Sequence, residues 1–281
     1  MEANAWRALD EIRPICEQVG TEQWRTELAP RLKSNSRRLP DDRGMMRIFA
    51  VAIAYSQNAQ SKQVSVLIET DEFCQAFADF DPAKLAREKS SVILGRHWAS
   101  LSSMRFRGKV ERIVQCAQVL CGIQKKFGSF TLYLRSFKIP QRLLSGDDFD
   151  AFWERFDLLR ADLWQREMPF FRSTTSLLQL LLDLDFDSVK PDLIVMRLAR
   201  RIGLVEREKG EPHFRAATKG IQRYAIERGL RACSLDLVML AFGGQTGMRD
   251  LLSQRFCPAV DPCRNAECSV GRKRLCSALE A

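Results

Sequence analysis

The feature that most constrains this chain is an apolar periodicity of three to four residues that continues along nearly its whole length. Apolar residues at i, i+3 and i+4 form one face of an α-helix, whereas alternating runs of β-branched residues, which would indicate strands, do not occur. Gly and Pro interrupt the pattern where helices should end. The sequence therefore predicts an all-α fold. Helices are expected at about 4–18, 21–33, 44–56, 61–70, 71–78, 83–88, 90–101, 107–127, 129–135, 148–165, 173–185, 192–203, 215–229 and 234–242.

The charge of the chain indicates a polyanionic partner. With 44 Lys and Arg against 35 Asp and Glu, the formal net charge is +9, and arginines cluster around Arg197–Arg201 and near the C-terminus. A basic surface favours a nucleic acid or an anionic membrane. No amphipathic helix with an aromatic-anchored basic face is visible, so we expect no membrane partner. A solvated, arginine-rich surface without a partner remains the alternative here.

Composition and cysteine usage indicate a reduced compartment. The 281 residues are 46% hydrophobic and 28% charged, which is ordinary for a globular protein with a sizeable core. The first residues, Met-Glu-Ala-Asn-Ala-Trp, have neither the basic nor the apolar part of a secretory signal. The nine cysteines are therefore interpreted as reduced thiols or metal ligands rather than disulfides. We therefore expect the protein to be located in the cytoplasm.

One carboxylate stands out in the segment from Met168 to Leu204. Asp192 follows Pro191 directly and precedes the apolar run Leu193–Met196, so a charged group is fixed at the start of a helix against apolar packing. Such a carboxylate on a basic protein can stabilise positive charge in a reaction on a polyanion. The alternative is a helix N-cap, because aspartate is common at that position.

The last four cysteines lie within twenty residues. Their gaps are five, four and seven residues, and no C-x-x-C pair occurs among them. Clustered thiolates suit either tetrahedral zinc or an iron–sulfur cluster, and the absence of a tight pair favours the bulkier 4Fe-4S cluster over zinc. Unliganded cysteines in a tail remain a third interpretation. The four residues are Cys257, Cys263, Cys268 and Cys276.

Several motifs taken together resemble those of the helix-hairpin-helix DNA glycosylase superfamily, and most closely its endonuclease III-like branch with a C-terminal iron–sulfur cluster. The family hairpin L-P-G-V-G-x-K-T-A is matched by MPFFRSTTS at 168–176, and V-D-T-H-x-x-R-[VL] by KPDLIVMRL at 190–198. The spacing of eighteen residues from Thr174 to Asp192 is that of the family. The segments 50–60 and 106–113 resemble two further helix motifs of the family.

Other features depart from that branch. The family's usual cysteine gaps are six, two and five residues, which differ from those of this chain. The segment FGSFTLYLRSFKIP at 127–140, and FDPAK at 80–84, instead resemble the 3-methyladenine glycosylase branch. The zinc ligands and the purine-recognition glutamate of that branch are not found. The resemblance covers about residues 44–276 and depends on the combination of motifs.

The resemblance implies a reaction. Cleavage of an N-glycosidic bond develops an oxocarbenium charge on deoxyribose, and Asp192 would stabilise that charge and orient or deprotonate a water. Bifunctional members form a Schiff base through the hairpin lysine. Thr174 stands at that position and has no amine, so a monofunctional DNA N-glycosylase that leaves an abasic site is expected.

The resemblance also implies DNA contacts. Gln57 would fill the gap left by the extruded base, with Asn58 or Gln60 in its place if the register differs by a few residues. Phosphate contacts are expected from the hairpin side chains and from the arginine that follows the aspartate, because both hairpin glycines are replaced. Tyr55, Trp98, Trp164 and Phe171 are aromatic candidates for base contact, with core packing as the alternative. The phosphate-contacting candidates are Arg172, Ser173, Thr174, Thr175 and Arg197.

These observations combine into a two-lobed helical glycosylase-like fold with four segments. They are an N-terminal helical segment at 1–43, a helical lobe with the gap filler at 44–145, a helix-hairpin-helix-like lobe with Asp192 at 146–250, and the four-cysteine tail at 251–281. The expected substrate is a damaged or modified base in DNA, with no other small molecule, and the unusual hairpin suggests modified phage bases. The alternative function is a non-catalytic DNA-binding protein that retains the scaffold and the metal cluster.

Overall fold

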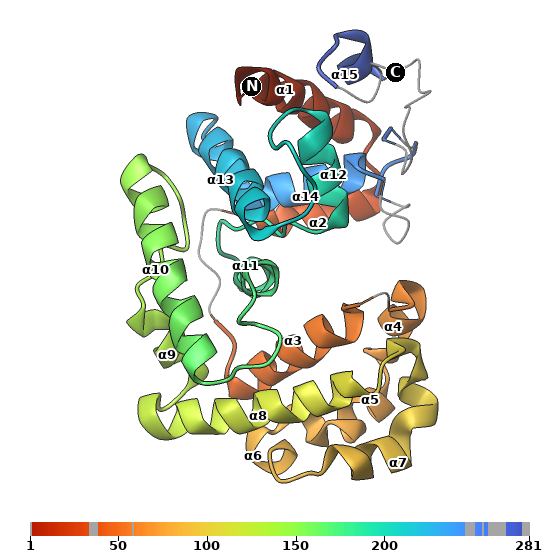
Figure 1. The fold of residues 1–281 in the computed structure, drawn as a ribbon. Coiled ribbons are helices and arrows are strands. Elements are labelled where there is room, and N and C mark those ends of the chain that lie inside the picture. The colour runs from red at the N-terminus through yellow and green to blue at the C-terminus, as the bar shows by residue number, and fades with distance from the viewer. Residues whose placement is uncertain are drawn as a thin grey trace. The chain divides into compact units, whose positions relative to one another are not determined.

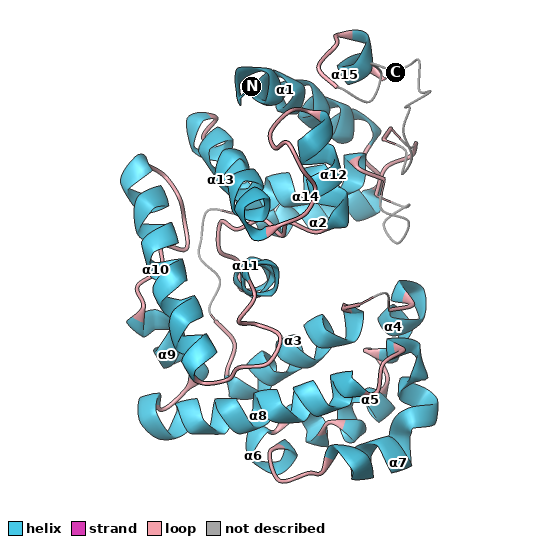
Figure 2. Cartoon of the chain, in the orientation of Figure 1, coloured by secondary structure: helices cyan, strands magenta, loops and turns pink. Residues whose placement is uncertain are grey.

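The computed structural model of the chain describes residues 2–33, 39–57, 59–244, 251–254, 256–257 and 268–276. Throughout these ranges the secondary structure consists of α-helices and short 3₁₀ turns without any strand (Figure 2). Gly20 and Leu252 form an isolated β-bridge. The prediction of an all-α fold is confirmed for this part of the chain. No helix within it is both long and apolar enough to cross a membrane.

The chain divides into two compact units, each made of segments far apart in sequence. Unit 1 comprises Met1–Arg37, Pro140–Phe152 and Leu184–Ala281, and unit 2 comprises Arg38–Ile139 and Trp153–Asp183. The chain passes from one unit to the other at four points, and one of these, between Phe152 and Trp153, falls inside the helix α10 (Gly146–Gln165). The four sequence segments divide the chain by motif rather than by contact, and they stay a prediction.

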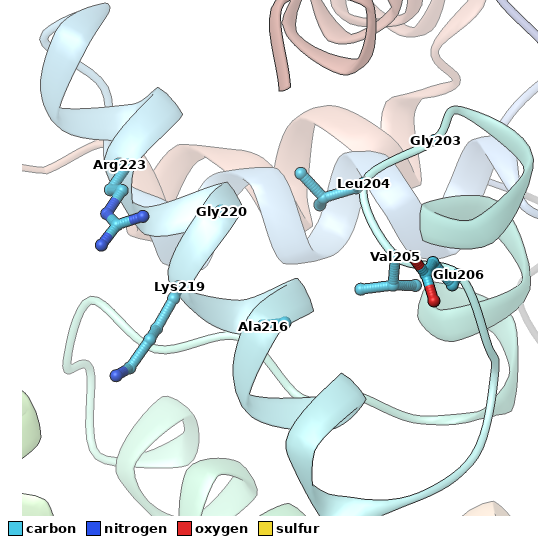
Figure 3. Close-up of a pocket in the computed structure, with 8 residues that line it drawn as sticks. All are labelled: Gly203, Leu204, Val205, Glu206, Ala216, Lys219, Gly220 and Arg223. Carbon is cyan, nitrogen blue, oxygen red and sulfur yellow. The ribbon is translucent and has the colours of Figure 1, made fainter. Parts of the chain in front are cut away.

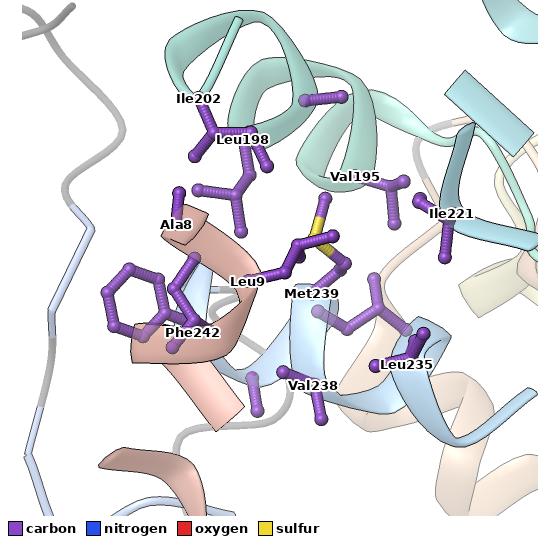
Figure 4. Packing of buried hydrophobic residues seen from close by; sticks show 14 of the residues in the cluster. Ala8, Leu9, Val195, Leu198, Ile202, Ile221, Leu235, Val238, Met239 and Phe242 are labelled. Carbon is purple, nitrogen blue, oxygen red and sulfur yellow. The ribbon is translucent and has the colours of Figure 1, made fainter. Parts of the chain in front are cut away.

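Unit 1 is built around one central apolar helix. That helix, α14, is buried along its whole length, because nearly every position carries an apolar or small side chain. α1, α12 and α13 pack against it, each through one apolar face. Figure 4 shows Leu9, Val195, Ile221 and Met239 meeting in this core. The helices of the unit are α1 (Glu2–Val19), α2 (Glu22–Leu32), α12 (Leu193–Arg201), α13 (Glu211–Glu227), α14 (Ala232–Phe242) and α15 (Ser269–Arg272), with the first turns of α10.

Unit 2 is organised by a long helix, α8, which contacts α3, α6, α7 and α9. Asp42 ties three of these helices together, because its carboxylate accepts from the Phe130 backbone at 2.7 Å and from Gln124 Nε2 at 2.8 Å. The elements, in the order traced in Figure 1, are α3 (Asp42–Tyr55), α4 (Ser61–Leu67), α5 (Asp71–Ala76), η1 (Ala78–Phe80), α6 (Pro82–Leu85), α7 (Ser90–Leu101), η2 (Ser102–Met104), α8 (Gly108–Phe127), α9 (Phe130–Ser136), the later part of α10 and α11 (Thr174–Asp183).

Gly243 lets the end of α14 approach the start of α12. A Cβ atom at this position would lie 2.5 Å from Ile194 Cγ2 and 2.8 Å from the Met239 carbonyl oxygen. Because the second of these atoms belongs to the backbone, a side chain cannot be accommodated by rotating a rotamer. Gly122, in the middle of α8, has no atom within 4 Å of the same construction.

These two glycines give a paired stability test. We expect Gly243→Ala to lower the free energy of unfolding by about 1–3 kcal/mol through overpacking. Gly122→Ala should raise it by about 0.5–1 kcal/mol, because alanine restricts the unfolded chain in a helical position. Urea unfolding followed by circular dichroism measures both. Equal and small effects of the two variants would contradict the close contact at Gly243.

Candidate active site

Asp192 occupies the N-cap of α12, and only one of its carboxylate oxygens is used there. Oδ1 accepts hydrogen bonds from the backbone N–H groups of Ile194 at 2.9 Å and Val195 at 3.0 Å. No group in the described part of the chain donates to Oδ2. The side chain is half-buried. The two interpretations of Asp192 are therefore compatible, since a capping carboxylate keeps a second oxygen for chemistry.

The backbone that carries Asp192 is anchored to α14 by a buried carboxylate. The N–H of Lys190 donates to Asp236 Oδ1 at 2.9 Å, and the N–H of Asp192 donates to the carbonyl of Lys190 at 2.8 Å. Arg31 of α2 reaches the other oxygen of Asp236 at 3.4 Å. Burial raises the pKa of Asp236 to about 6, against the effect of Arg31, and the nearby Asp192 charge also raises it. Asp236 thus links the backbone before Asp192 to α14 and α2.

The segment before Asp192 is irregular yet buried, so its polar groups need partners from side chains. Every residue from 184 to 189 is buried. Side-chain amides of α13 and of the 140–145 loop donate to its carbonyls, with Gln222 Nε2 at 2.8 Å from the Asp187 oxygen and Gln141 Nε2 at 3.2 Å from the Leu184 oxygen. Helix α13 and the 140–145 loop therefore fix the path of this segment.

Arg231 at the start of α14 neutralises two carboxylates of this buried segment. Its Nε lies 2.9 Å from Asp187 Oδ1, and its Nη1 lies 2.8 Å from Asp185 Oδ1. Burial raises the pKa of Asp187 to about 6, opposed by the Leu143 N–H and by Arg142. A buried pair of this kind depends on its partner, because a buried charge left alone is costly.

Two arginines of α12 point into unit 1 rather than to solvent. Arg197 is 8% exposed and its Nη2 donates to the Gly243 carbonyl at 2.6 Å. Arg201 is 1% exposed and its Nη1 donates to Cys257 Sγ at 2.7 Å. The predicted DNA contact of Arg197 stays a prediction, and its burial favours a structural role.

The cysteine tail is only partly within the described residues. Cys257 and Cys268 are buried and Cys276 is half-buried against the core of unit 1, whereas Cys263 lies outside the described residues. Burial raises the pKa of the Cys257 thiol, and the Arg201 charge opposes this effect. In the described ranges no three potential metal ligands gather at one point. The four-cysteine metal site therefore stays a prediction.

The hairpin belongs to unit 2 and keeps a left-handed turn without glycine. Phe170, at the position of the first family glycine, has φ 66°. The buried Phe171 packs on Phe49 with ring centroids 4.7 Å apart, which favours core packing over the predicted base contact. Thr174 is only 3% exposed, whereas Ser173 is exposed and caps α11 through Ser176. Thr175 is half-buried.

The predicted gap filler, Gln57, is an exposed residue just after α3 with φ 49°. Its Oε1 accepts from Arg112 Nη1 at 3.1 Å. The buried Lys109 donates to the carbonyl oxygens of Ala54 and Ser56 at the end of α3, and burial lowers its pKa to about 8. Lys109 and Arg112, whose roles the sequence did not reveal, together position the turn at Gln57.

The remaining predicted DNA contacts are Tyr55 and Asn58, and the predicted site residues are distributed over both units. The Tyr55 hydroxyl donates to Ser65 Oγ at 2.8 Å, and its ring is 36% exposed, so it stays a candidate for base contact. Asn58, the alternative gap filler, lies outside the described residues. Asp192 and Arg197 belong to unit 1, whereas Gln57, Tyr55 and the hairpin residues belong to unit 2.

A hollow of about 320 Å³ in unit 1 contains none of the predicted site residues. Figure 3 shows the loop after α12 on one side and α13 on the other, with Leu204 and Val205 opposite Lys219 and Arg223. Its size and mainly apolar lining provide no converging polar groups of the kind that fix a ligand.

The comparison with protein families supports the class expected from the motifs. The model of the methyladenine glycosylase family matches residues 40–176, which include Gln57 and the hairpin but end before Asp192. No curated protein matches the chain. Just under half of the chain is therefore similar to methyladenine glycosylases, which are DNA glycosylases.

The buried network predicts a large difference between two arginines. Arg231→Gln should lower the free energy of unfolding by about 3–5 kcal/mol, because two buried carboxylates lose their shared cation. The control, Arg228→Gln, removes an ion pair with Asp10 whose side chains are 39% and 37% exposed. It should cost much less, because an exposed ion pair contributes little to stability. Urea unfolding measures both, and similar losses would show that the buried pairs are not essential.

Proposed function

We propose that this protein is a monofunctional DNA N-glycosylase in which Asp192 stabilises the sugar cation. The observation that carries the proposal is the difference in hydrogen bonding between the two oxygens of the Asp192 carboxylate. Oδ1 is held by two backbone N–H groups, whereas Oδ2 accepts no hydrogen bond from the described residues. The carboxylate is thus fixed in place and still has an oxygen for the reaction, as electrostatic catalysis requires.

The proposed reaction breaks the bond between C1′ of deoxyribose and the base nitrogen. The electron pair of that bond leaves with the base, and positive charge develops on the sugar. Asp192 Oδ2 stabilises this charge and orients a water, which adds to C1′ and loses a proton. No amine stands at the family's lysine position, where Thr174 is buried. A Schiff base and strand cleavage are therefore not expected, and the product is an abasic site.

The DNA contacts are proposed for exposed and half-buried residues of unit 2. Gln57 enters the space left by the extruded base, and Ser173, Arg172 and Thr175 hold the phosphate backbone near the start of α11. Tyr55 is the remaining candidate for base contact. Arg197, Thr174 and Phe171 are packed inside their units, and the proposal does not depend on them.

For the cysteine tail we propose a 4Fe-4S cluster, with zinc as the alternative. The support is the thiolate chemistry of three described cysteines at the edge of one core, with Arg201 donating to Cys257. Such a cluster would act as a structural clamp for the tail. Iron and acid-labile sulfide in the purified protein distinguish the two metals.

The substrate base is the most specialised part of the proposal. Both hairpin glycines of the family are replaced by larger residues, Phe170 and Arg172. A departure at the DNA-binding hairpin suits an unusual substrate, and modified phage bases are one such class. The second candidate function, a non-catalytic DNA-binding protein, is favoured by the fact that capping alone accounts for the Oδ1 contacts of Asp192.

Asp192→Asn separates the two functions. Asparagine is as good an N-cap as aspartate, so the fold should be retained while base excision falls by at least about 10²-fold. The assay treats duplexes with varied modified bases, including phage DNA, with protein and then with alkali. Strand breaks should need the alkali step.

A matched control is Asp41→Asn, because Asp41 caps α3 through its contact with the Gly44 N–H at 2.8 Å. This variant changes the same group at another cap and should excise bases as the wild type does. Excision that persists unchanged in Asp192→Asn would overturn the catalytic role. Silence of the wild type across the whole panel would favour the binding protein.

A further inference from the structure

An arginine of the hairpin lies stacked on an exposed tryptophan. The guanidinium carbon of Arg172 lies 4.6 Å from the ring centroid of Trp164, which is 59% exposed near the end of α10. Arg160, one turn earlier in α10, donates from Nε to the Arg172 carbonyl at 3.2 Å. Both the backbone and the side chain of Arg172 are therefore held by the same helix.

The charge of Arg172 is not neutralised within the described part of the chain. No carboxylate there comes within ion-pair distance of its guanidinium. Arg166 of the same region provides the contrast, because it forms an ion pair with Asp162 while lying over the rings of Phe127 and Tyr133. A guanidinium stacked on a ring keeps its N–H donors in the plane, where they can meet an anion.

The turn that precedes Arg172 contains a left-handed residue that is not glycine. The turn itself is kept, since Phe170 has φ 66°. Arg172 is the one cation of the hairpin segment 168–176, so it is the residue of this segment that can attract a phosphate by charge.

We infer that Trp164 and Arg172 form a preorganised clamp for one phosphate of the DNA backbone. Arg172 contacts the phosphate, and Trp164 is a positioning residue that holds the guanidinium in a fixed plane. The clamp rests on the proposed DNA partner, but it does not depend on which base is removed. A different use of Trp164, stacking on an extruded base, is an outcome that the experiment distinguishes.

The experiment measures binding of an unmodified labelled duplex by fluorescence anisotropy over a range of salt concentrations. Loss of one phosphate contact reduces the slope of log K against log salt by about 0.9. We expect Arg172→Ala to show this reduction. The control is Lys125→Gln, which removes an exposed positive charge in the last turn of α8 and should leave the slope unchanged.

Variants of the tryptophan test the positioning role. Trp164→Ala should weaken binding several-fold, whereas Trp164→Phe, which keeps an aromatic face, should bind nearly as the wild type does. In the Arg172→Ala background, Trp164→Ala should reduce the affinity for the duplex little further, because the effects of residues that act as one unit are not additive. Arg172→Lys keeps the charge without the planar stack, so its slope should stay near that of the wild type while its affinity falls.

Two results would overturn the clamp. One is an unchanged salt slope in Arg172→Ala. The other is a Trp164→Ala loss that persists in the Arg172→Ala background and occurs only with a duplex containing an unpaired base, which would assign Trp164 to base stacking. The glycosylase proposal is tested separately. A reduced salt slope in Arg172→Ala, together with no base excision by the wild type, would support the clamp but not the glycosylase. Base excision by the wild type, together with an unchanged slope in Arg172→Ala, would refute the clamp but not the glycosylase.

Discussion

The pairing of Arg231 with Asp185 and Asp187 is the interaction on which the candidate site depends. An irregular segment that is buried cannot satisfy its backbone groups by itself, and here its charges and carbonyls find partners on surrounding helices. Burial raises the pKa of Asp187 to about 6, and the Leu143 N–H and the Arg142 charge oppose this effect. The segment leads directly to Asp192. Its rigidity is what places a carboxylate at the start of α12.

Asp192 and the hairpin differ in how the local backbone affects the candidate functional side chain. At Asp192, a common helix cap leaves one carboxylate oxygen available, so stability and chemistry do not compete for the same atom. At the hairpin, Phe170 adopts the left-handed conformation that favours glycine. Arg172 lies over the ring of Trp164, and no described carboxylate pairs with it. Both arrangements are compatible with the proposed N-glycosylase.

The helices could be predicted from the sequence because apolar periodicity and the caps are local. The expected helices at 107–127 and 192–203 correspond to α8 (Gly108–Phe127) and α12 (Leu193–Arg201), and the interpretation of Asp192 as a cap is confirmed. Partnerships between distant residues could not be predicted. Asp236 belongs to α14, whose sequence is otherwise mostly apolar. Nothing in the spacing indicates that its carboxylate accepts a hydrogen bond from the Lys190 N–H.

The same limit explains the uncertain site residues. The sequence predicts a base contact for Phe171 from its aromatic ring and a DNA contact for Arg197 from its motif, but neither reveals which way a side chain points. Phe171 is fully buried and Arg197 nearly so. The discontinuous units are likewise invisible in a linear pattern, because α10 crosses from one to the other. Secondary structure could thus be predicted from the sequence, whereas side-chain burial and pairing between distant residues could not.

The most direct test of the account uses the charge of the transition state instead of a particular base. A duplex in which one deoxyribose is replaced by a positively charged pyrrolidine mimics the sugar cation, and a neutral tetrahydrofuran at the same position is its control. The wild type should bind the cationic duplex at least about 10-fold more tightly than the neutral one, as expected for a site complementary to the transition state. Asp192→Asn should lose this preference. Equal affinity of the wild type for both duplexes, or a preference that survives in the variant, would contradict the role of Asp192.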